Sequence, residues 1–307
     1  MADVIQTTRT LPRQALAAPT SRRRMWRGHL QGSEYAWALA FCVPYVAVFF
    51  AFVVYPVAFG IWMGSEPFLY TTLFSDPIYL KTVVNTALFL GIAINLKLFL
   101  ALMLSGFFMR PGWWTKALLM IFVLPWAVPA LPTYISIHWM LNGEYGLFNN
   151  LLYELFGITG PDWLTSRWTS LGSAMVTHIW KWLPFWTVIL LAGRMAIPTE
   201  IQDAARVDGA TGFRTFLHVN FPLLANLYLI CTLLSTIFSL CDFNSVYFVT
   251  GGGPADSTHV LATLGIRYAF DLAQPRLGVA AVISALPLLI PLVIILMRKF
   301  RTSQVEL

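Results

Sequence analysis

Long runs without a charged side chain are the feature that most constrains how this chain can fold. No Asp, Glu, Lys or Arg occurs in any of four stretches, 35–65, 117–143, 215–241 and 277–297. Two further apolar segments, 82–109 and 170–193, are each interrupted by a single lysine, Lys97 and Lys181. Because about 18 apolar residues are enough to span a bilayer, the sequence predicts six membrane-spanning segments.

The composition and pattern of these runs indicate helices in a bilayer. Hydrophobic residues make up 58% of the chain and charged residues 11%, whereas a soluble domain carries about 25% charged residues. The runs are long and lack the ten-residue alternation of a membrane barrel. Pro125, Pro129 and Pro132 crowd the third run, which a helical bundle tolerates where neighbours re-satisfy the freed carbonyls. We therefore expect an all-α membrane protein.

Lysine and arginine predict how the chain is oriented. The N-terminal tail, the second and fourth loops and the C-terminal tail together hold fourteen of these residues, and the other loops hold four. Positive residues favour the cytoplasmic side, so both termini are expected there. The net charge of +6 then follows from topology, and no nucleic-acid partner is needed to explain it.

Motifs for chemistry are absent from the sequence. No G-x-x-x-x-G-K-[ST], H-E-x-x-H or G-x-S-x-G pattern occurs, and no Cys/His set has metal-ligand spacing. We therefore expect no catalytic, nucleotide or metal site in this chain.

The fourth loop, residues 197–214, predicts a compact bend of two short helices. Pro198 suits a first helical turn, and Gly209 can take positive φ and end that helix. Thr211 is placed to cap a second helix, and Pro222 to restart the chain toward the fifth span. Two interpretations stay open: an ordered connecting loop, or a docking element for a partner.

This loop resembles the E-A-A-x(3)-G-x(9)-I-x-L-P signature of binding-protein-dependent importer permeases. The matching positions are Asp203-Ala204-Ala205, Gly209 and Val219-Asn220-Phe221-Pro222. Asp, Val and Phe replace the family's Glu, Ile and Leu. Three further segments are similar to the first permease subunit of maltose- and glycerol-phosphate-type carbohydrate importers: T-G-G-G-P at 250–254, W-K-W-L-P-F at 180–185 and G-L-F-N at 146–149.

The resemblance implies a fold and an assembly. It implies the type I ATP-binding-cassette (ABC) importer permease fold, with about six transmembrane helices and a cytoplasmic coupling helix between spans four and five. The chain then divides into an N-terminal tail at 1–34, a first span and outer loop at 35–81, the transmembrane domain at 82–298 and a C-terminal tail at 299–307. The implied coupling residues are Asp203, Ala204, Ala205, Asp208, Gly209 and Ala210.

The resemblance also implies partners in a bacterial inner membrane. A second homologous permease completes the translocation path for a sugar or sugar derivative, and a solute-binding protein delivers the solute. Two ATP-binding subunits hydrolyse ATP with Mg, so no cofactor is expected in this chain itself. Lipid surrounds the spans.

Polar residues within the spans are candidates for the solute path, because ionisable groups there are costly and often functional. The candidates are Asn95, Lys97, Trp180, Lys181, Trp182, Asp242 and Asn244. For Lys181 and Asp242 the alternative is a structural pair between two helices. Lys97 stands where the family usually has a small residue, so it either snorkels to an interface or lines the path of an anionic sugar.

Two other functional classes are considered. An ion-driven secondary transporter would often show an inverted repeat of broken helices, and it leaves the loop signature unexplained. A membrane-embedded enzyme would need a nucleophile or metal set within the spans, and none is visible in the sequence.

Overall fold

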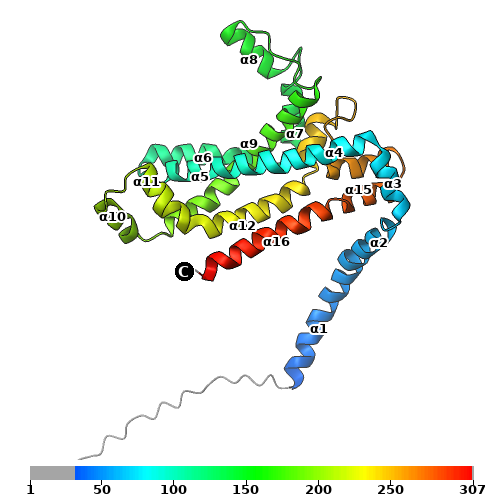
Figure 1. Ribbon diagram of the computed structural model, residues 1–307, viewed down its shortest axis with the longest axis horizontal. Coiled ribbons are helices and arrows are strands. Elements are labelled where there is room, and N and C mark those ends of the chain that lie inside the picture. Colours follow the sequence, from blue (N-terminus) through cyan, green and yellow to red (C-terminus); the bar gives the residue numbers. More distant parts are fainter. Residues whose placement is uncertain (1–31, 306–307) are drawn as a thin grey trace, which may run out of the picture. The chain divides into compact units, whose positions relative to one another are not determined.

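A computed structural model describes residues 32–305, and within this range every regular element is helical. The elements in chain order are α1 Gly32–Phe49, η1 Phe50–Val54, α2 Tyr55–Met63, α3 Pro67–Ser75, α4 Pro77–Leu88, η2 Phe89–Ile94, α5 Asn95–Phe108, α6 Trp113–Ala127, α7 Ala130–Met140, α8 Leu147–Phe156, α9 Arg167–Met195, α10 Thr199–Val207, α11 Phe213–Thr215, η3 Phe216–Asn220, α12 Phe221–Leu240, α13 Asn244–Thr250, α14 Leu261–Ile266, η4 Arg267–Asp271, α15 Pro275–Ile283 and α16 Leu286–Val305 (Figure 1). The elements labelled η are π-helical turns. The all-α prediction is confirmed.

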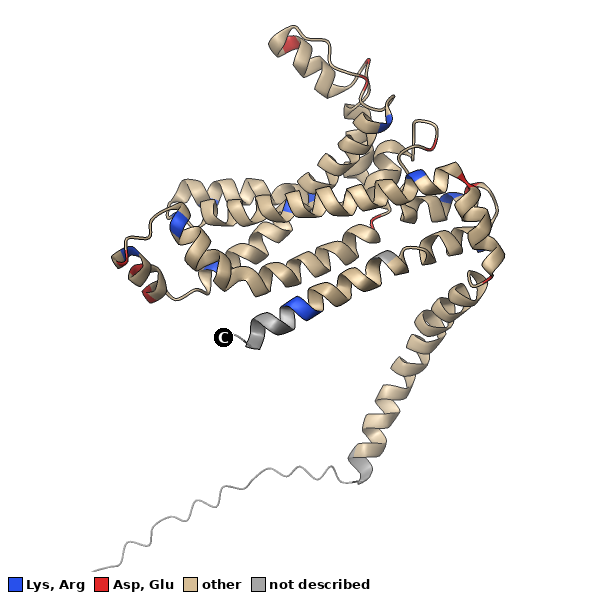
Figure 2. Cartoon of the chain, viewed as in Figure 1, with Lys and Arg blue, Asp and Glu red and all other residues tan. Residues whose placement is uncertain are grey.

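Several of these helices are long and apolar enough to cross a bilayer. Four continuous helices of the described chain have the required length and composition: Tyr35–Met63, Pro77–Phe108, Arg167–Met195 and Phe213–Leu240. The third predicted span is a bent pair, α6 and α7, with an angle of 93° between the two helices. The sixth predicted stretch, 277–297, is divided between α15 and α16. Figure 2 shows charged residues mainly in loops and at helix ends, with few along the spans.

The bend between α6 and α7 follows from the proline spacing. Val128 is extended, with ψ 141°, as expected for a residue before proline. In an α-helix the carbonyls of residues 125 and 128 would accept from the N–H groups of residues 129 and 132. Both of those positions are proline and have no N–H. The Lys181 ammonium donates to both orphaned carbonyls, at 2.7 Å from Pro125 O and also to Val128 O.

Helices α5, α9 and α12 form the central bundle, in which α5 and α9 have the most extensive packing. Their shared core includes Leu98, Trp186, Leu190 and Leu224, each at most 2% exposed. Figure 1 shows these helices running side by side, with α10 and α11 beyond one end of the bundle. This bundle therefore positions the bend that carries α10 and, elsewhere, helices α7 and α8.

The described residues form two compact units, one of residues 32–56 and the other of residues 57–305. In this first unit the described side chains of α1, Trp37 and Phe41 among them, are exposed and apolar. Such a helix needs lipid or another protein around it. The predicted tail at 1–34 lies outside the described residues except for its last three, and the domain boundaries stay a prediction.

Candidate coupling elbow and solute groove

The segment between α9 and α12 is a bend, here called the elbow (residues 197–215). Helix α10 ends at Val207, and Gly209 has φ +77°. The Gly209 N–H donates to Arg206 O at 3.0 Å, and the Ala210 N–H donates to Ala205 O at 2.9 Å. These bonds satisfy the last carbonyls of α10, and the left-handed conformation strains any residue but glycine. The predicted helix end at Gly209 is present.

Two details of the elbow differ from the sequence expectation. Thr211 does not cap the next helix; Gly212, with φ +54°, precedes α11 and has no side-chain cap. Phe213–Leu240 is one continuous helix, so Pro222 lies inside the fifth span and does not restart it. The π-helical turn η3 ends at Asn220, two residues before this proline, and such a wider turn accommodates local disruption of the hydrogen-bond ladder.

The outward face of α10 consists of Glu200, Asp203, Ala204 and Val207, all exposed. Their spacing of three and four residues places them on one helix face. On the opposite side Ala205 is buried. Of the remaining predicted coupling residues, Asp208 is exposed and Ala210 half-buried.

Asp203 accepts from Arg206 at 2.9 Å, and both side chains are at least 65% exposed. Exposed pairs contribute about 0–1 kcal/mol, so this pair does little to hold the elbow together. Both charges are therefore available to a partner.

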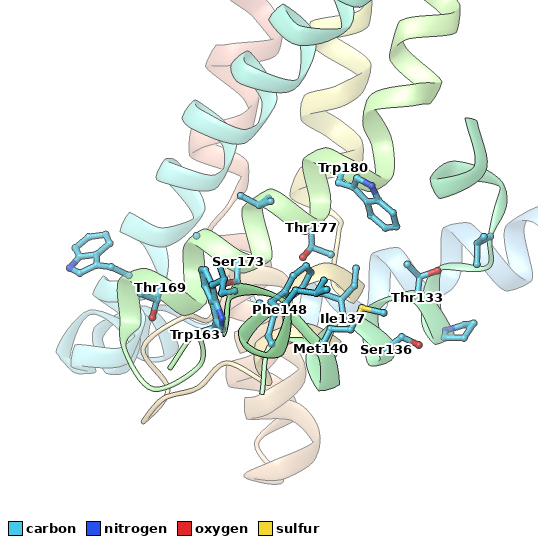
Figure 3. A pocket seen from close by; sticks show the side chains of 18 of the residues that line it. Thr133, Ser136, Ile137, Met140, Phe148, Trp163, Thr169, Ser173, Thr177 and Trp180 are labelled. Carbon is cyan, nitrogen blue, oxygen red and sulfur yellow. The ribbon is translucent and has the colours of Figure 1, made fainter. Parts of the chain in front are cut away.

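A groove of about 1090 Å³ lies between α7, α8 and the first half of α9. Thr169, Ser173 and Thr177 line it from one side of α9, and Thr133 and Ser136 line it from α7 (Figure 3). The groove is also lined by three indoles, Trp163, Trp168 and Trp180. None of the described residues that line it is Asp, Glu, Lys, Arg or His. The groove wall is thus predominantly apolar and aromatic, with a few hydroxyls and no ionised group.

Helix α8 covers this groove with an apolar stripe. Phe148, Leu151, Leu152 and Leu155 all line the groove and follow helical spacing. Asn149 fixes the helix: its Nδ2 donates to Gly143 O at 2.9 Å, and its Oδ1 accepts from Trp163 Nε1 at 2.8 Å. The G-L-F-N segment therefore ties α8 to the loops on either side of it.

Lys97 lies in a buried polar network that joins α5, α9 and the end of α12. Its Nζ is 2.9 Å from His178 Nε2 and 3.5 Å from Ser239 Oγ. His178 Nδ1 is 2.7 Å from Asp242 Oδ2. An ammonium only donates, so Nε2 accepts and the ring proton on Nδ1 is donated to Asp242. Lys97 and His178 are each 1% exposed.

The expected pair of Lys181 and Asp242 is not present. Lys181 donates to the carbonyls freed by the prolines of the α6–α7 bend, and Asp242 accepts from His178. The W-K-W-L-P-F segment therefore supports the bent third span through its lysine.

The other path candidates are scattered. Asn95 is exposed and donates to Gly91 O of its own helix at 2.6 Å. Trp182 is half-buried against the bundle core, and Asn244 is exposed at the start of α13. Among the seven predicted path residues, Trp180 is the one that lines the groove. The groove hydroxyls of α9 were missed, although their spacing of four residues could have indicated a shared face.

The T-G-G-G-P segment forms a tight loop after α13. Gly251 and Gly252 have φ +62° and +80°, and a Cβ on Gly252 would overlap the His259 ring. The carbonyls of Ser257 and His259 accept from Asn85 Nδ2 at 2.8 and 3.0 Å, which fastens the loop to α4. Burial lowers the pKa of His259 below its ordinary value, although the neighbouring Asp256 acts in the opposite direction.

Comparison with known proteins agrees with this architecture. Residues 97–302 match the family described as "Binding-protein-dependent transport system inner membrane component". The trehalose/maltose transport system permease protein of Thermococcus litoralis is 33% identical over 178 residues, 58% of this chain and 60% of that protein. The sulfoquinovosyl glycerol transport system permease protein of Agrobacterium fabrum is 36% identical over 140 residues, 46% of this chain and 45% of that protein. These matches span about half to three fifths of each relative's length.

Solved structures give the same fold. A bacterial ABC transporter involved in the import of the acidic polysaccharide alginate matches with a TM-score of 0.76 and 20% identity, over 88% of this chain and 96% of that one. The same type of transporter in complex with an alginate pentasaccharide-bound periplasmic protein matches with a TM-score of 0.71 and 19% identity, over 86% and 93%. The fold is that of type I ABC importer permeases, and the chain belongs to the family of binding-protein-dependent transport system inner membrane components.

Proposed function

We propose that this chain is one of two permease subunits of an ABC importer for a sugar or sugar derivative. The elbow carries the proposal. Its helix α10 ends at a left-handed glycine and turns Glu200, Asp203, Ala204 and Val207 away from the rest of the described chain. An exposed face on a short, sharply ended helix suits insertion into a cleft of a partner. The partner we propose is an ATP-binding subunit, with the elbow on the cytoplasmic side.

The rest of the assembly follows from this role. A second homologous permease would complete the path, two ATP-binding subunits would use ATP and Mg, and a solute-binding protein would deliver the solute from outside. ATP-driven closure of the ATPase pair would shift the permease pair between inward- and outward-facing states. This is a two-state element biased by ligands at both ends. Both termini would lie in the cytoplasm, and the spans of this chain would cross the inner membrane of a bacterial cell.

The groove supports a sugar as the solute. Sugar rings present apolar C–H faces that stack on aromatic rings, and the groove wall is predominantly apolar, with three indoles and a few side-chain hydroxyls. Trp180, at 45% exposed, and Thr177 are the wall residues that we propose contact the solute. The names of the relatives, which include trehalose, maltose and sulfoquinovosyl glycerol, agree with this class.

An anionic sugar would need a positive charge, and Lys97 is our candidate to supply it. In the described conformation its ammonium contacts His178 and Ser239 and is not part of the groove wall. Lys97 would therefore have to leave this network when the path opens. Uptake by a Lys97→Met variant tests the idea, because unchanged affinity and rate would exclude a Lys97 contact with the solute.

Docking of the elbow is tested by co-purification with the ATP-binding subunits. Gly209→Val should strain the end of α10 and reduce the bound ATPase by about tenfold, within the usual range of coupling effects. Gly157→Val is the matched control, because Gly157 also ends a helix with positive φ (+66°) and also has open space around its Cβ position. Equal binding by Gly209→Val and wild type, or no ATPase on the wild-type chain, would refute the proposal.

An ion-driven transporter can be distinguished from an ABC importer by its energy source. Uptake that survives a proton ionophore but stops when ATP is depleted supports the ABC assembly. The reverse result would favour a secondary transporter, which needs no ATPase and leaves the elbow without a role.

A further inference from the structure

One buried arginine of α9 contacts two other segments, α5 and η3, at the elbow end of the bundle. Arg194 lies in the last turn of α9 and is 7% exposed. Its Nη2 donates to Leu102 O of α5 at 3.1 Å. Its guanidinium carbon lies 5.7 Å from the centroid of the Phe216 ring, the first residue of η3. A cation over an aromatic face within about 6 Å is attracted to it.

The neighbouring residues leave room for this arrangement. Gly106 of α5 has no side chain, and a Cβ there would lie 3.2 Å from Arg194 Nη1. The Arg194 Nε is buried without a hydrogen-bond partner. A desolvated, partly unsatisfied cation is a poor means of stabilising a fold. The arrangement is better explained by geometry, because one rigid group holds α5, α9 and η3 together.

The elbow has few other connections to the bundle. The main packing partners of α10 are α11 and η3, so displacement of α10 reaches the spans through η3 and through the short link to α9, in which Ile197 packs against the core cluster. Phe216 packs against the core cluster that contains Leu98, Leu102 and Leu190, and Arg194 adds a directed contact from Phe216 to Leu102. Helix α5 also carries Lys97, whose network continues to α9 and α12.

We infer that Arg194 is a positioning residue that makes α5 move with the coupling elbow when the ATP-binding subunits close. The inference rests on the proposed function, since the displacement of the elbow comes from the ATPase. A purely structural role would instead fix the resting fold and leave nucleotide-driven motion unaffected.

Spin-label distances in the assembled complex test this inference. Cys42, Cys231 and Cys241 are replaced by serine, and labels are placed on Ile201 of α10 and Phe99 of α5, which are 40% and 53% exposed. Distances are measured without nucleotide and after trapping with MgATP and orthovanadate. With Arg194 present, the two labels should keep the same distance in both states. In Arg194→Met the resting distance should be unchanged. In the trapped state, however, the coupled population, meaning the fraction of complexes that keep the resting distance, should fall about tenfold.

Three further variants make the result decisive. Arg194→Lys keeps the charge and should restore part of the coupled population. Gly106→Ala keeps Arg194 but places a Cβ 3.2 Å from its guanidinium, so the guanidinium must shift by a few tenths of an ångström and a smaller loss is expected, even if Arg194→Met folds poorly. Arg110→Met is the matched control, because Arg110 also lies over a ring, that of Phe107 at 5.4 Å, but is exposed.

Two results would overturn the inference, and they are distinguishable. Unchanged distances in trapped Arg194→Met and Gly106→Ala complexes would remove the role of Arg194 while the ATPase assembly stands. Failure of the wild-type chain to bind the ATPase, or of the complex to trap vanadate, would instead remove the proposed function, and the inference with it.

Discussion

Removing the charge of Lys97 should destabilise the bundle strongly. In Lys97→Met the apolar stem is kept, but His178 Nε2 loses its donor at 2.9 Å, and the Asp242 carboxylate, 2.7 Å from His178 Nδ1, loses the cation to which His178 links it. Lys97 and Asp242 make no direct ion pair but are linked through the His178 ring, so the cost should not exceed about 3–5 kcal/mol, which is the cost of breaking a buried ion pair by removing one partner. Ser239 Oγ, 3.1 Å from Nε2, can donate in place of the ammonium, so the lower end of this range is expected.

The free energy of unfolding is measured by denaturant titration in mixed micelles. Lys81→Met is the matched control, because Lys81 is exposed near the start of α4 and such surface changes stay within about 0.5 kcal/mol. The double variant Lys97→Met/Asp242→Asn removes both charges together and should recover about 1–3 kcal/mol of the loss. A loss below about 1 kcal/mol for Lys97→Met, or strictly additive losses in the double variant, would refute the network.

Three more predictions concern the α6–α7 bend and the loop after α13. Lys181→Met leaves the carbonyls of Pro125 and Val128 without a donor and should cost about 1–3 kcal/mol for each; Pro132→Ala in that background restores an N–H for Val128 and should recover part of the loss in the same titration. Gly252→Ala should lower the thermal midpoint, because the new methyl meets the His259 ring, whereas Gly60→Ala, with open space at its Cβ, should not. Acid should destabilise the fold through His259: burial lowers its folded pKa, the unfolded chain therefore binds more protons, and stability is lost as pH falls below about 6.5. Melting at pH 7.5 and 5.5 should show a smaller acid-induced loss for His259→Gln than for the wild type, and equal losses would contradict this.

Features that depend on local sequence were predictable. The charge-free stretch 35–65 corresponds closely to the helix Tyr35–Met63, because span length is set by the bilayer. The end of α10 at Gly209 was predictable because only glycine enters the left-handed region without strain. The role of Lys181 was partly encoded too, since Pro129 and Pro132 each lie four residues after a carbonyl that needs a donor. Only the identity of that donor required the structure.

Features that depend on long-range pairing were not predictable. His178 is 81 residues from Lys97 and 64 from Asp242, and the sequence does not say which of several buried polar groups meet. The expected Lys181–Asp242 pair was a reasonable match of charges, but the proline carbonyls compete for the lysine. The groove was not predicted for a similar reason. Helix α8, which covers it, has a position that depends on the contacts of Asn149 with Gly143 and Trp163.

The partners of the charged residues in the described spans bear on selectivity. Lys97, Lys181 and Arg194 each donate to a named group inside the chain, and the groove wall is uncharged. A free cation facing the groove would favour anions at all times, whereas a cation held by His178 is available only when the helices that carry the two residues move apart. If the solute is anionic, its recognition must therefore depend on conformation: the charge would be presented when α5 and α9 separate and withdrawn when they close. Selectivity for charge would then be coupled to the same helix motion that the elbow is proposed to drive.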